Sequence, residues 1–204
     1  NGSVSTMGKA KRKSIQTAPE SIGSLLAPLQ ALQYLLSQFH DQGVIIGGVA
    51  VSLLGTPRYT VDLDAVFLLS LGDIPRLLTE AAKLEIEPRI SDPISFARKS
   101  RVLLLRHRPS GIDIDLSLGI LPFEYEMVLR SKMVDLGTIQ IRLPTPEDLI
   151  IMKAIAHRSK DLADIQAIAS SHPNIDKERI RFWVEQFSEA LELPELWSDI
   201  SKLL

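Results

Sequence analysis

The sequence predicts an α/β (α+β) protein, in which a small mixed β-sheet is flanked by helices and followed by a C-terminal helical region. Apolar residues recur at helical spacing over residues 20–41, whereas residues 60–69 and 112–118 alternate in the manner of strands. Beyond residue 144 the apolar residues return to helical spacing and keep it to the end of the chain. Strand-like alternation followed by helical spacing of the apolar residues predicts a sheet-containing core followed by helices.

The chain of 204 residues is long enough for one domain, or for a core domain with a small helical one. We expect residues 1–19 to form a disordered tail that begins with a vector-derived remnant. Residues 20–144 are then the core and residues 145–204 the helical region. A basic run, Lys9–Lys13, lies in the tail; we interpret it as solvated, and contact with RNA is the alternative.

The expected elements follow from periodicity and from glycine and proline positions. In chain order they are a helix over 20–41, a strand over 44–47, a short buried helix over 48–55, a strand over 60–69, a helix over 73–84, a short strand and helix within 86–100, strands over 102–107 and 112–118, a helix over 122–130, a hairpin over 133–143, and helices from 146 onward. Gly43 is expected to end the first helix. Thr145 and Pro146 form a helix start, and Asp148 completes a capping-box-like pattern.

Composition excludes several classes of protein. The net charge is −2, so the chain has no overall electrostatic attraction to nucleic acid. It has no cysteine, which excludes disulfides, thiol catalysis and cysteine zinc sites, and its four histidines lack zinc-like spacing. No apolar run approaches 18 residues, so we expect no membrane span and a cytoplasmic location.

Two aspartates on one predicted strand are the strongest chemical signal. Asp62 and Asp64 are two residues apart, so their side chains lie on the same face of the strand. The surrounding segment is apolar, and two carboxylates there would repel each other and resist loss of water. A hard cation with oxygen ligands removes that cost, which predicts Mg²⁺ or Mn²⁺ at this position.

A second acidic strand and a glycine pair extend the predicted site. Asp113 and Asp115 repeat the spacing about fifty residues later, and the two strands could be neighbours in one sheet. Three carboxylates can hold two metal ions, which align a nucleophile with a nucleoside triphosphate. Gly47 and Gly48 precede a short helix, where free backbone N–H groups favour phosphate. Asp-x-Asp on the solvent side of a sheet and Gly-Gly in a simple turn are the alternatives.

The combination of these motifs resembles the nucleotidyltransferase superfamily with the DNA polymerase β-type fold, and within it the branch of AbiEii-type toxins. The resemblance spans roughly residues 40 to 170. It rests on Gly47-Gly48, Arg58-x-Thr60-x-Asp62-x-Asp64, a later strand acid, Leu121-Pro122-Phe123-Glu124, Pro144 to Leu149, Met152-Lys153, and Arg158-x-Lys160-Asp161-x-x-Asp164-Ile165. Together these motifs are fairly specific, whereas each alone is weak.

The resemblance implies a set of site residues. Asp62, Asp64 and Asp115 would be the catalytic and metal-binding acids, and Asp113 is the alternative third ligand or a supporting group. The nucleotide-binding residues would be Gly47, Gly48, Arg58, Thr60 and Lys153. Arg158, Asp161 and Asp164 would either support the site by orienting Lys153 and Arg58 or form an ordinary ion-pair set on a helix surface. Lys153 would contact the triphosphate or extend to the surface.

The implied reaction is Mg²⁺-dependent transfer of a nucleoside monophosphate from a nucleoside triphosphate, such as ATP, to an acceptor hydroxyl. A tRNA, a protein or a small molecule is the expected acceptor, and the toxin-like branch implies a cognate antitoxin as a partner. Many active members carry Gly-Ser where this chain has Gly47-Gly48. The alternatives are a non-catalytic nucleotide-binding or regulatory module of the same fold and, more weakly, a Mg²⁺ phosphohydrolase.

Overall fold

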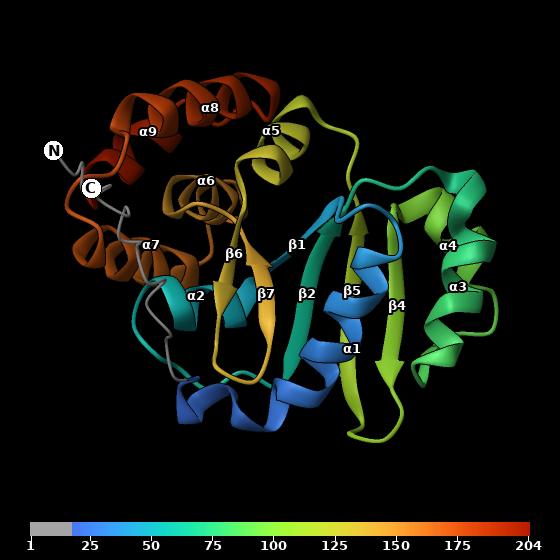
Figure 1. The fold of residues 1–204 in the computed structure, drawn as a ribbon. Coiled ribbons are helices and arrows are strands. Elements are labelled where there is room, and N and C mark those ends of the chain that lie inside the picture. The colour runs from blue at the N-terminus through green and yellow to red at the C-terminus, as the bar shows by residue number, and fades with distance from the viewer. Residues whose placement is uncertain (1–17) are drawn as a thin grey trace, which may run out of the picture.

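A five-stranded mixed sheet forms the centre of the molecule, as the sequence predicts (Figure 1). The computed structural model describes residues 18–204, so the predicted tail and its basic run fall almost wholly outside the described residues. The strand order in the sheet is β1-β2-β5-β4-β3, and β6 and β7 form a separate two-stranded sheet. The strands are β1 (Gly43–Ile46), β2 (Asp62–Phe67), β3 (Ile86–Pro88), β4 (Val102–His107), β5 (Ile112–Leu118), β6 (Lys132–Asp135) and β7 (Gln140–Leu143).

Helices surround the sheet and make up the C-terminal part of the chain (Figure 1). They are α1 (Leu26–Ser37), α2 (Gly47–Leu54), α3 (Ile74–Lys83), α4 (Pro93–Ser100), α5 (Pro122–Arg130), α6 (Pro146–Ala156), α7 (Ser159–Ser171), α8 (Lys177–Ala190) and α9 (Leu196–Ser201), with 3₁₀ turns η1 (Glu20–Leu25) and η2 (Leu71–Asp73). No helix among residues 18–204 combines the length and the apolar character needed to cross a bilayer.

The pairing of the central strands determines where polar groups can lie. β2 runs parallel to β5 and antiparallel to β1, while β4 pairs antiparallel with β5, so the predicted hairpin of residues 102–118 is confirmed. One face of β2 and β5 is fully buried at Leu63, Ala65, Ile114 and Leu116. Because strand residues alternate between faces, the residues between them carry their side chains to the opposite face. The hydrophobic core therefore anchors the strands and leaves that opposite face for polar chemistry.

The N-terminal helix is shorter than predicted. Residues 20–25 form a 3₁₀ turn, and α1 ends at Ser37 instead of continuing to residue 41. His40 and Asp41 have φ of +63° and +53°, so two left-handed residues redirect the chain before Gly43, which begins β1 and does not cap the helix. The edge-to-face contact of Phe39 with Phe67 holds this turn against β2, with ring centroids 5.5 Å apart.

Helix α6 begins as predicted but uses its acidic residue differently. The Thr145 hydroxyl accepts a hydrogen bond from the Asp148 backbone N–H at 3.3 Å, which confirms Thr145 as the N-cap. The fully buried Asp148 carboxylate accepts from Arg179 Nε at 2.8 Å and lies 3.4 Å from Arg130 Nε. Asp148 therefore ties α6 to α8 and α5 instead of closing a capping box.

Candidate active site

The four aspartates of β2 and β5 lie side by side on one face of the sheet. In the parallel register Asp62 pairs with Asp113 and Asp64 pairs with Asp115. The prediction that the two acidic strands are neighbours is confirmed. We call this surface, formed by Asp62, Asp64, Asp113 and Asp115, the acid face. Four carboxylates at adjacent sheet positions repel one another unless cations lie among them.

Asp64 is the acid-face residue in the least favourable environment for a negative charge. Burial, together with the charges of Asp62 and Asp115, raises the pKa of Asp64 from 3.8 to about 6, although Lys153 and Lys160 act in the opposite direction. The pairing of Asp64 with Ile46 puts it beside the end of β1, where α2 begins. A carboxylate that is partly buried among like charges is a typical feature of a functional site.

Two arginines distinguish Asp113 from Asp115. Arg106 Nε donates to Asp113 Oδ1 at 2.6 Å and Arg89 Nη1 donates to Asp113 Oδ2 at 2.8 Å, so both oxygens of Asp113 are engaged. The hydrogen bond from Arg106, with support from Arg89, lowers the pKa of Asp113. Within residues 18–204, Asp115 receives only Arg89 Nη2, at its Oδ1, and burial raises its pKa. Asp115 is thus the acid of β5 with an oxygen free of arginine.

The glycine pair is required by the two side chains that it faces, Asp64 and Thr60. Gly47 has φ of +64°, and a Cβ there would lie 2.7 Å from the Asp64 Cγ atom. A Cβ on Gly48 would lie 2.7 Å from the Thr60 Cβ atom. Real Cβ atoms do not approach other atoms so closely, so both positions need glycine for Asp64 and Thr60 to stay in place. Whether backbone amides here also bind phosphate stays a prediction.

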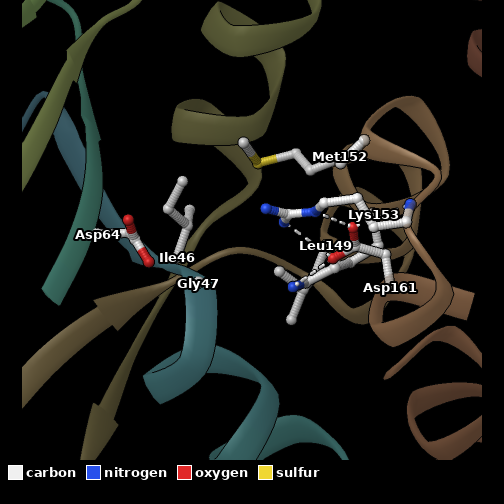
Figure 2. A pocket seen from close by; sticks show the side chains of 9 residues that line it. Ile46, Gly47, Asp64, Leu149, Met152, Lys153 and Asp161 are labelled. Carbon is white, nitrogen blue, oxygen red and sulfur yellow. Dashed lines mark hydrogen bonds and ion pairs between the residues drawn. The ribbon is translucent and has the colours of Figure 1, made fainter. Parts of the chain in front are cut away.

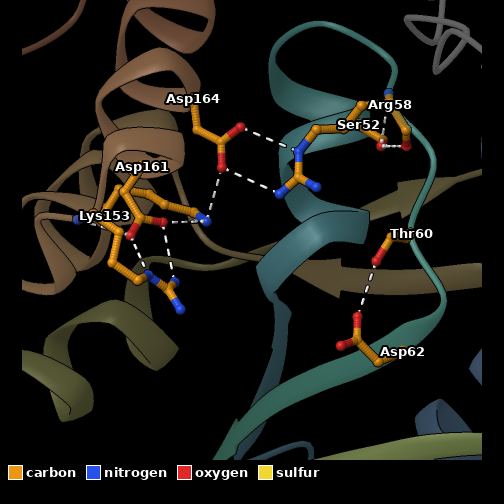
Figure 3. Close-up of polar contacts among 8 residues, drawn as sticks. Ser52, Arg58, Thr60, Asp62, Lys153, Asp161 and Asp164 are labelled. Atoms are coloured by element: carbon orange, nitrogen blue, oxygen red, sulfur yellow. Dashed lines mark hydrogen bonds and ion pairs between the residues drawn. The ribbon is translucent and has the colours of Figure 1, made fainter.

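The segment before β2 fixes Asp62 and Arg58. Thr60 Oγ1 donates to Asp62 Oδ1 at 3.0 Å, so Thr60, predicted as a nucleotide-binding residue, orients the carboxylate predicted to bind the metal ion. The Ser52 hydroxyl of α2 donates to the Arg58 carbonyl at 2.7 Å and accepts from the Arg58 backbone N–H at 3.2 Å. These bonds hold the loop against α2 and direct the Arg58 side chain toward α7 (Figure 3).

An ion network with a buried centre lies across from the acid face (Figure 3). Lys153 Nζ lies 3.0 Å from Asp161 Oδ1 and 2.9 Å from Asp164 Oδ2, and its side chain is only 8% exposed. Arg58 donates from Nε and Nη2 to the two oxygens of Asp164, and Arg158 donates in the same way to Asp161. We call these five residues the lysine network. Three cations face two carboxylates in it, which leaves one net positive charge.

The network excludes two of the alternatives that the sequence left open. Asp161 and Asp164 are buried, so they are not a helix-surface ion-pair set. Lys153 does not extend to the surface, because its ammonium group lies between these two carboxylates. An ammonium group has three donors, and the two aspartates account for two of them. A third N–H of Lys153 therefore stays available to an anion.

One pocket joins the two charged groups (Figure 2). Gly47 and Asp64 form one side of it, and α6 and the start of α7 form the other. Its volume is about 170 Å³, and it is lined by Ile46, Gly47, Asp64, Leu149, Met152, Lys153, Ala156, Arg158 and Asp161. The structure thus brings Gly47, Asp64, Lys153, Arg158 and Asp161 around one space. Arg58 and Asp164 support it from behind Lys153, and Asp113 lies at the far side of the acid face.

Four residues that act on this site were not among the site residues predicted from the sequence, although Lys160 stands in one of the quoted motifs. Arg89 and Arg106 bind the β5 acids, Ser52 holds the Arg58 loop, and the charge of Lys160 acts on Asp64. Arg106 lies directly opposite Asp113 in the β4–β5 register, so a correct hairpin register would have identified it. Arg89 follows a three-residue strand and had no sequence signal of this kind.

The donor chemistry of the acid face fits a divalent cation, although the acids are not gathered around one point. Among residues 18–204, no three acidic or histidine side chains converge closely enough to hold one metal ion. Burial, together with the repulsion from Asp62 and Asp115, raises the pKa of Asp64, and a hard cation with oxygen ligands would remove this cost. Asp62, Asp64 and the free oxygen of Asp115 are the donors suited to it.

The comparison with protein families decides the assignment. Residues 30–202 match the family described as "Nucleotidyl transferase AbiEii toxin, Type IV TA system". The chain belongs to the AbiEii family. This match covers most of the chain, including both strands of the acid face and the whole lysine network, and it confirms the resemblance found in the motifs. A search of the curated proteins finds no match.

Solved structures agree with this membership at the level of the fold. An antigenic nucleotidyltransferase-like protein from Paracoccidioides brasiliensis is similar with a TM-score of 0.53 and 17% identity, over 91% of this chain and 94% of that one. The antibiotic-resistance factor ANT(2'')-Ia is similar with a TM-score of 0.52 and 12% identity, over 82% of this chain and 95% of that one. The AbiEii chain therefore has a nucleotidyltransferase fold.

Proposed function

We propose that this AbiEii-family chain transfers a nucleoside monophosphate from a nucleoside triphosphate to an acceptor hydroxyl, with Mg²⁺ or Mn²⁺ as cofactor. One observation carries the proposal: the pocket has the Asp64 carboxylate of the acid face on one side and a net positive ion network on the other. A metal–triphosphate needs both, because the cation seeks oxygen ligands and the phosphates seek positive charge. Family membership supports the same reaction class.

The acid side would bind the cofactor. Asp62, Asp64 and Asp115 are the donors, because they share one face of the sheet and Asp115 keeps one oxygen free of arginine. A bound divalent cation would supply charge neutralisation and a more acidic acceptor hydroxyl. Thr60 would hold Asp62 in its orientation, and Gly47 would leave room for the Asp64 carboxylate.

The basic side would bind the phosphates. Lys153 has one N–H beyond those directed at Asp161 and Asp164, and it lines the pocket. Arg158 also lines the pocket, and its side chain is 58% exposed, so it can rotate toward a ligand. Arg58 would act mainly by holding Asp164, and with it the position of Lys153.

The reaction follows from this placement. The acceptor oxygen forms a bond to the α-phosphorus while the bond from that phosphorus to the bridging oxygen of the β-phosphate breaks. Pyrophosphate leaves with the bonding electron pair, and the hydroxyl proton passes to Asp115, the acid of β5 that lies beside Asp64. The cations of the lysine network stabilise the charge that accumulates on the pyrophosphate.

The acceptor and the biological role belong to the same proposal. The family description names a toxin of a type IV toxin–antitoxin system, which supports a toxin-like role and an antitoxin partner. We propose an RNA hydroxyl, such as the 3′ end of a tRNA, as the first acceptor to test, with a protein hydroxyl as the alternative. ATP is one of the nucleotides to be compared.

A label-transfer assay tests the proposal. The protein is incubated with each α-labelled nucleoside triphosphate, Mg²⁺ or Mn²⁺, and a mixture of cellular RNA and protein. We expect a labelled band that requires the metal ion, and its RNase or protease sensitivity would give the acceptor class. Asp64→Asn should reduce labelling by roughly a thousandfold or more, because it removes a central ligand.

Asp113→Asn is the matched control, since it makes the same change on the same face of the sheet. Labelling should stay within about tenfold of the wild-type level, because both Asp113 oxygens are engaged by arginines and do not face the cation. Asp115→Asn should behave like Asp64→Asn. Metal-dependent nucleotide binding without any labelling would instead favour a regulatory module, and release of free phosphate would favour a phosphohydrolase.

A further inference from the structure

Arg89 occupies an unusual place on the acid face. Its backbone N–H donates to the Leu104 carbonyl at 2.9 Å, which fixes it at the end of β3, alongside β4. Leu104 pairs with Asp115 in the register of β4 and β5. Arg89 is therefore separated from Asp115 in the sheet by a single strand position, that of Leu104. Its two terminal nitrogens separate there, one to Asp113 and one to Asp115. Arg89 therefore bridges the two acids of β5.

The two contacts of Arg89 are not equivalent. Asp113 also receives Arg106, so losing Arg89 would leave it with one arginine. Among the ion pairs of residues 18–204, Asp115 pairs only with Arg89. Asp115 is therefore in direct contact with the positive charge of the Arg89 guanidinium. Asp115 is also the β5 acid that lies beside Asp64.

The positive charge of Arg89 lies where it would oppose the binding of a cation to Asp115. A carboxylate oxygen that accepts from an arginine has less negative charge to offer a metal ion, and the arginine repels that ion directly. The pair is partly open to water, with side-chain exposures of 23% for Arg89 and 46% for Asp115. Ion pairs with this exposure are weak, so a divalent cation can displace the arginine.

We propose that Arg89 is a built-in competitor for the cation: it occupies Asp115 in the free protein and thereby sets how tightly the acid face binds a divalent cation. The inference rests on the proposed function, because it takes the acid face to be the metal site. Arg89 releases Asp115 when the cation arrives with the triphosphate. The metal alone then binds weakly, and the metal with nucleotide binds productively.

Titration of the full chain with Mn²⁺ alone, followed by electron paramagnetic resonance of the free ion, tests the inference. Arg89→Gln should bind Mn²⁺ about tenfold more tightly than wild type, because both the competing donor and its charge are gone. Arg89→Lys keeps the charge but cannot bridge two acids, so we expect a gain of about threefold. A gain in affinity is not what a loosened or misfolded variant would give.

Arg106→Gln is the matched control, since it removes an arginine from the same face but leaves the Arg89–Asp115 contact. Its Mn²⁺ affinity should change by less than about threefold. In an Asp115→Asn background, Arg89→Gln should give a clearly smaller gain than the tenfold expected with Asp115 present, because only the repulsion by the Arg89 charge is then removed. Equal Mn²⁺ affinities of wild type and both Arg89 variants, with label transfer intact, would overturn the inference alone. Absence of Mn²⁺ binding and of label transfer in all of them would overturn the proposed function as well.

Discussion

Asp64 and Asp161 lie on opposite sides of one pocket and have opposite electrostatic states. Burial and two neighbouring acids raise the pKa of Asp64 to about 6. Burial also acts to raise the pKa of Asp161, but hydrogen bonds from Arg158 and Lys153 outweigh it and lower the value to about 2. Within the described part of the chain, the negative charge of an aspartate therefore lacks a neighbouring cation in direct contact at Asp64 on the sheet, whereas Lys153 and Arg158 neutralise it at Asp161 between the helices.

This difference separates a structural ion network from a binding surface. The lysine network satisfies its own carboxylates, so its charges stabilise the junction of α6, α7 and the Arg58 loop. On the acid face, the Asp64 carboxylate has no hydrogen-bond or ion-pair partner among residues 18–204, and its burial among like charges costs free energy in the isolated protein. An unfavourable position of this kind is typical of a binding site, because a bound cation removes the unfavourable free energy. This is the physical argument for a ligand at Asp64.

The largest effect should come from removing the charge at the centre of the lysine network. Lys153→Met leaves the buried Asp161 and Asp164 without their shared cation. We expect a loss of about 3 kcal/mol in the free energy of unfolding, at the low end for a broken buried pair because each acid keeps its arginine. Urea denaturation measures it. Lys160→Met, at an exposed position, should change stability by less than about 0.5 kcal/mol. Equal effects of the two substitutions would contradict the structural role of the network.

A smaller effect should appear in acid. The folded-state pKa of Asp161 is about 2 against an ordinary 3.8, so the carboxylate contributes stability above pH 3.8 and loses it as the pH falls toward 2. The shift corresponds to something on the order of 2 kcal/mol at neutral pH. The stability difference between wild type and Asp161→Asn should shrink by that amount between pH 5 and roughly pH 2. Denaturant titrations over this range measure it.

Asp199→Asn is the control for the acid series, because its ion pairs with His157 and Lys202 are long and its side chain is 45% exposed. Its stability difference from wild type should change much less over the same pH range. If the Asp161 difference stayed constant with pH, the compensation of Asp161 by Lys153 and Arg158 would be wrong.

The smallest effect concerns the glycine beside Asp64. Gly47 and Gly111 have φ of +64° and +69°, so alanine costs each about 1 kcal/mol in backbone strain. A Cβ at Gly111 meets nothing within 4 Å, whereas one at Gly47 overlaps the Asp64 carboxylate. Gly47→Ala should therefore cost roughly 1 to 2 kcal/mol more than Gly111→Ala in thermal unfolding. Only Gly47→Ala should also reduce label transfer, and equal costs would mean that Asp64 moves aside freely.

Local pattern determined much of the fold and the acidic half of the site. The alternation of residues 112–118 and the turn before it predicted β5 and its hairpin with β4 within the observed bounds. The spacing of Asp62 with Asp64, and of Asp113 with Asp115, required one face for each pair because strand side chains alternate. Thr145 and Pro146 likewise marked the start of α6, since capping depends on adjacent residues.

Only the tertiary structure decided how the charges are compensated. Lys153 meets Asp164 through the crossing of α6 and α7, and Arg58 reaches Asp164 across 106 residues of sequence. Arg89 reaches Asp115 because a three-residue strand ends beside Leu104. Helical and strand periods specify the face on which a side chain lies, but which opposite charge meets it depends on long-range packing. For that reason the acids could be found in the sequence, whereas a partner that only long-range packing supplies, such as Arg89 for Asp115, could not.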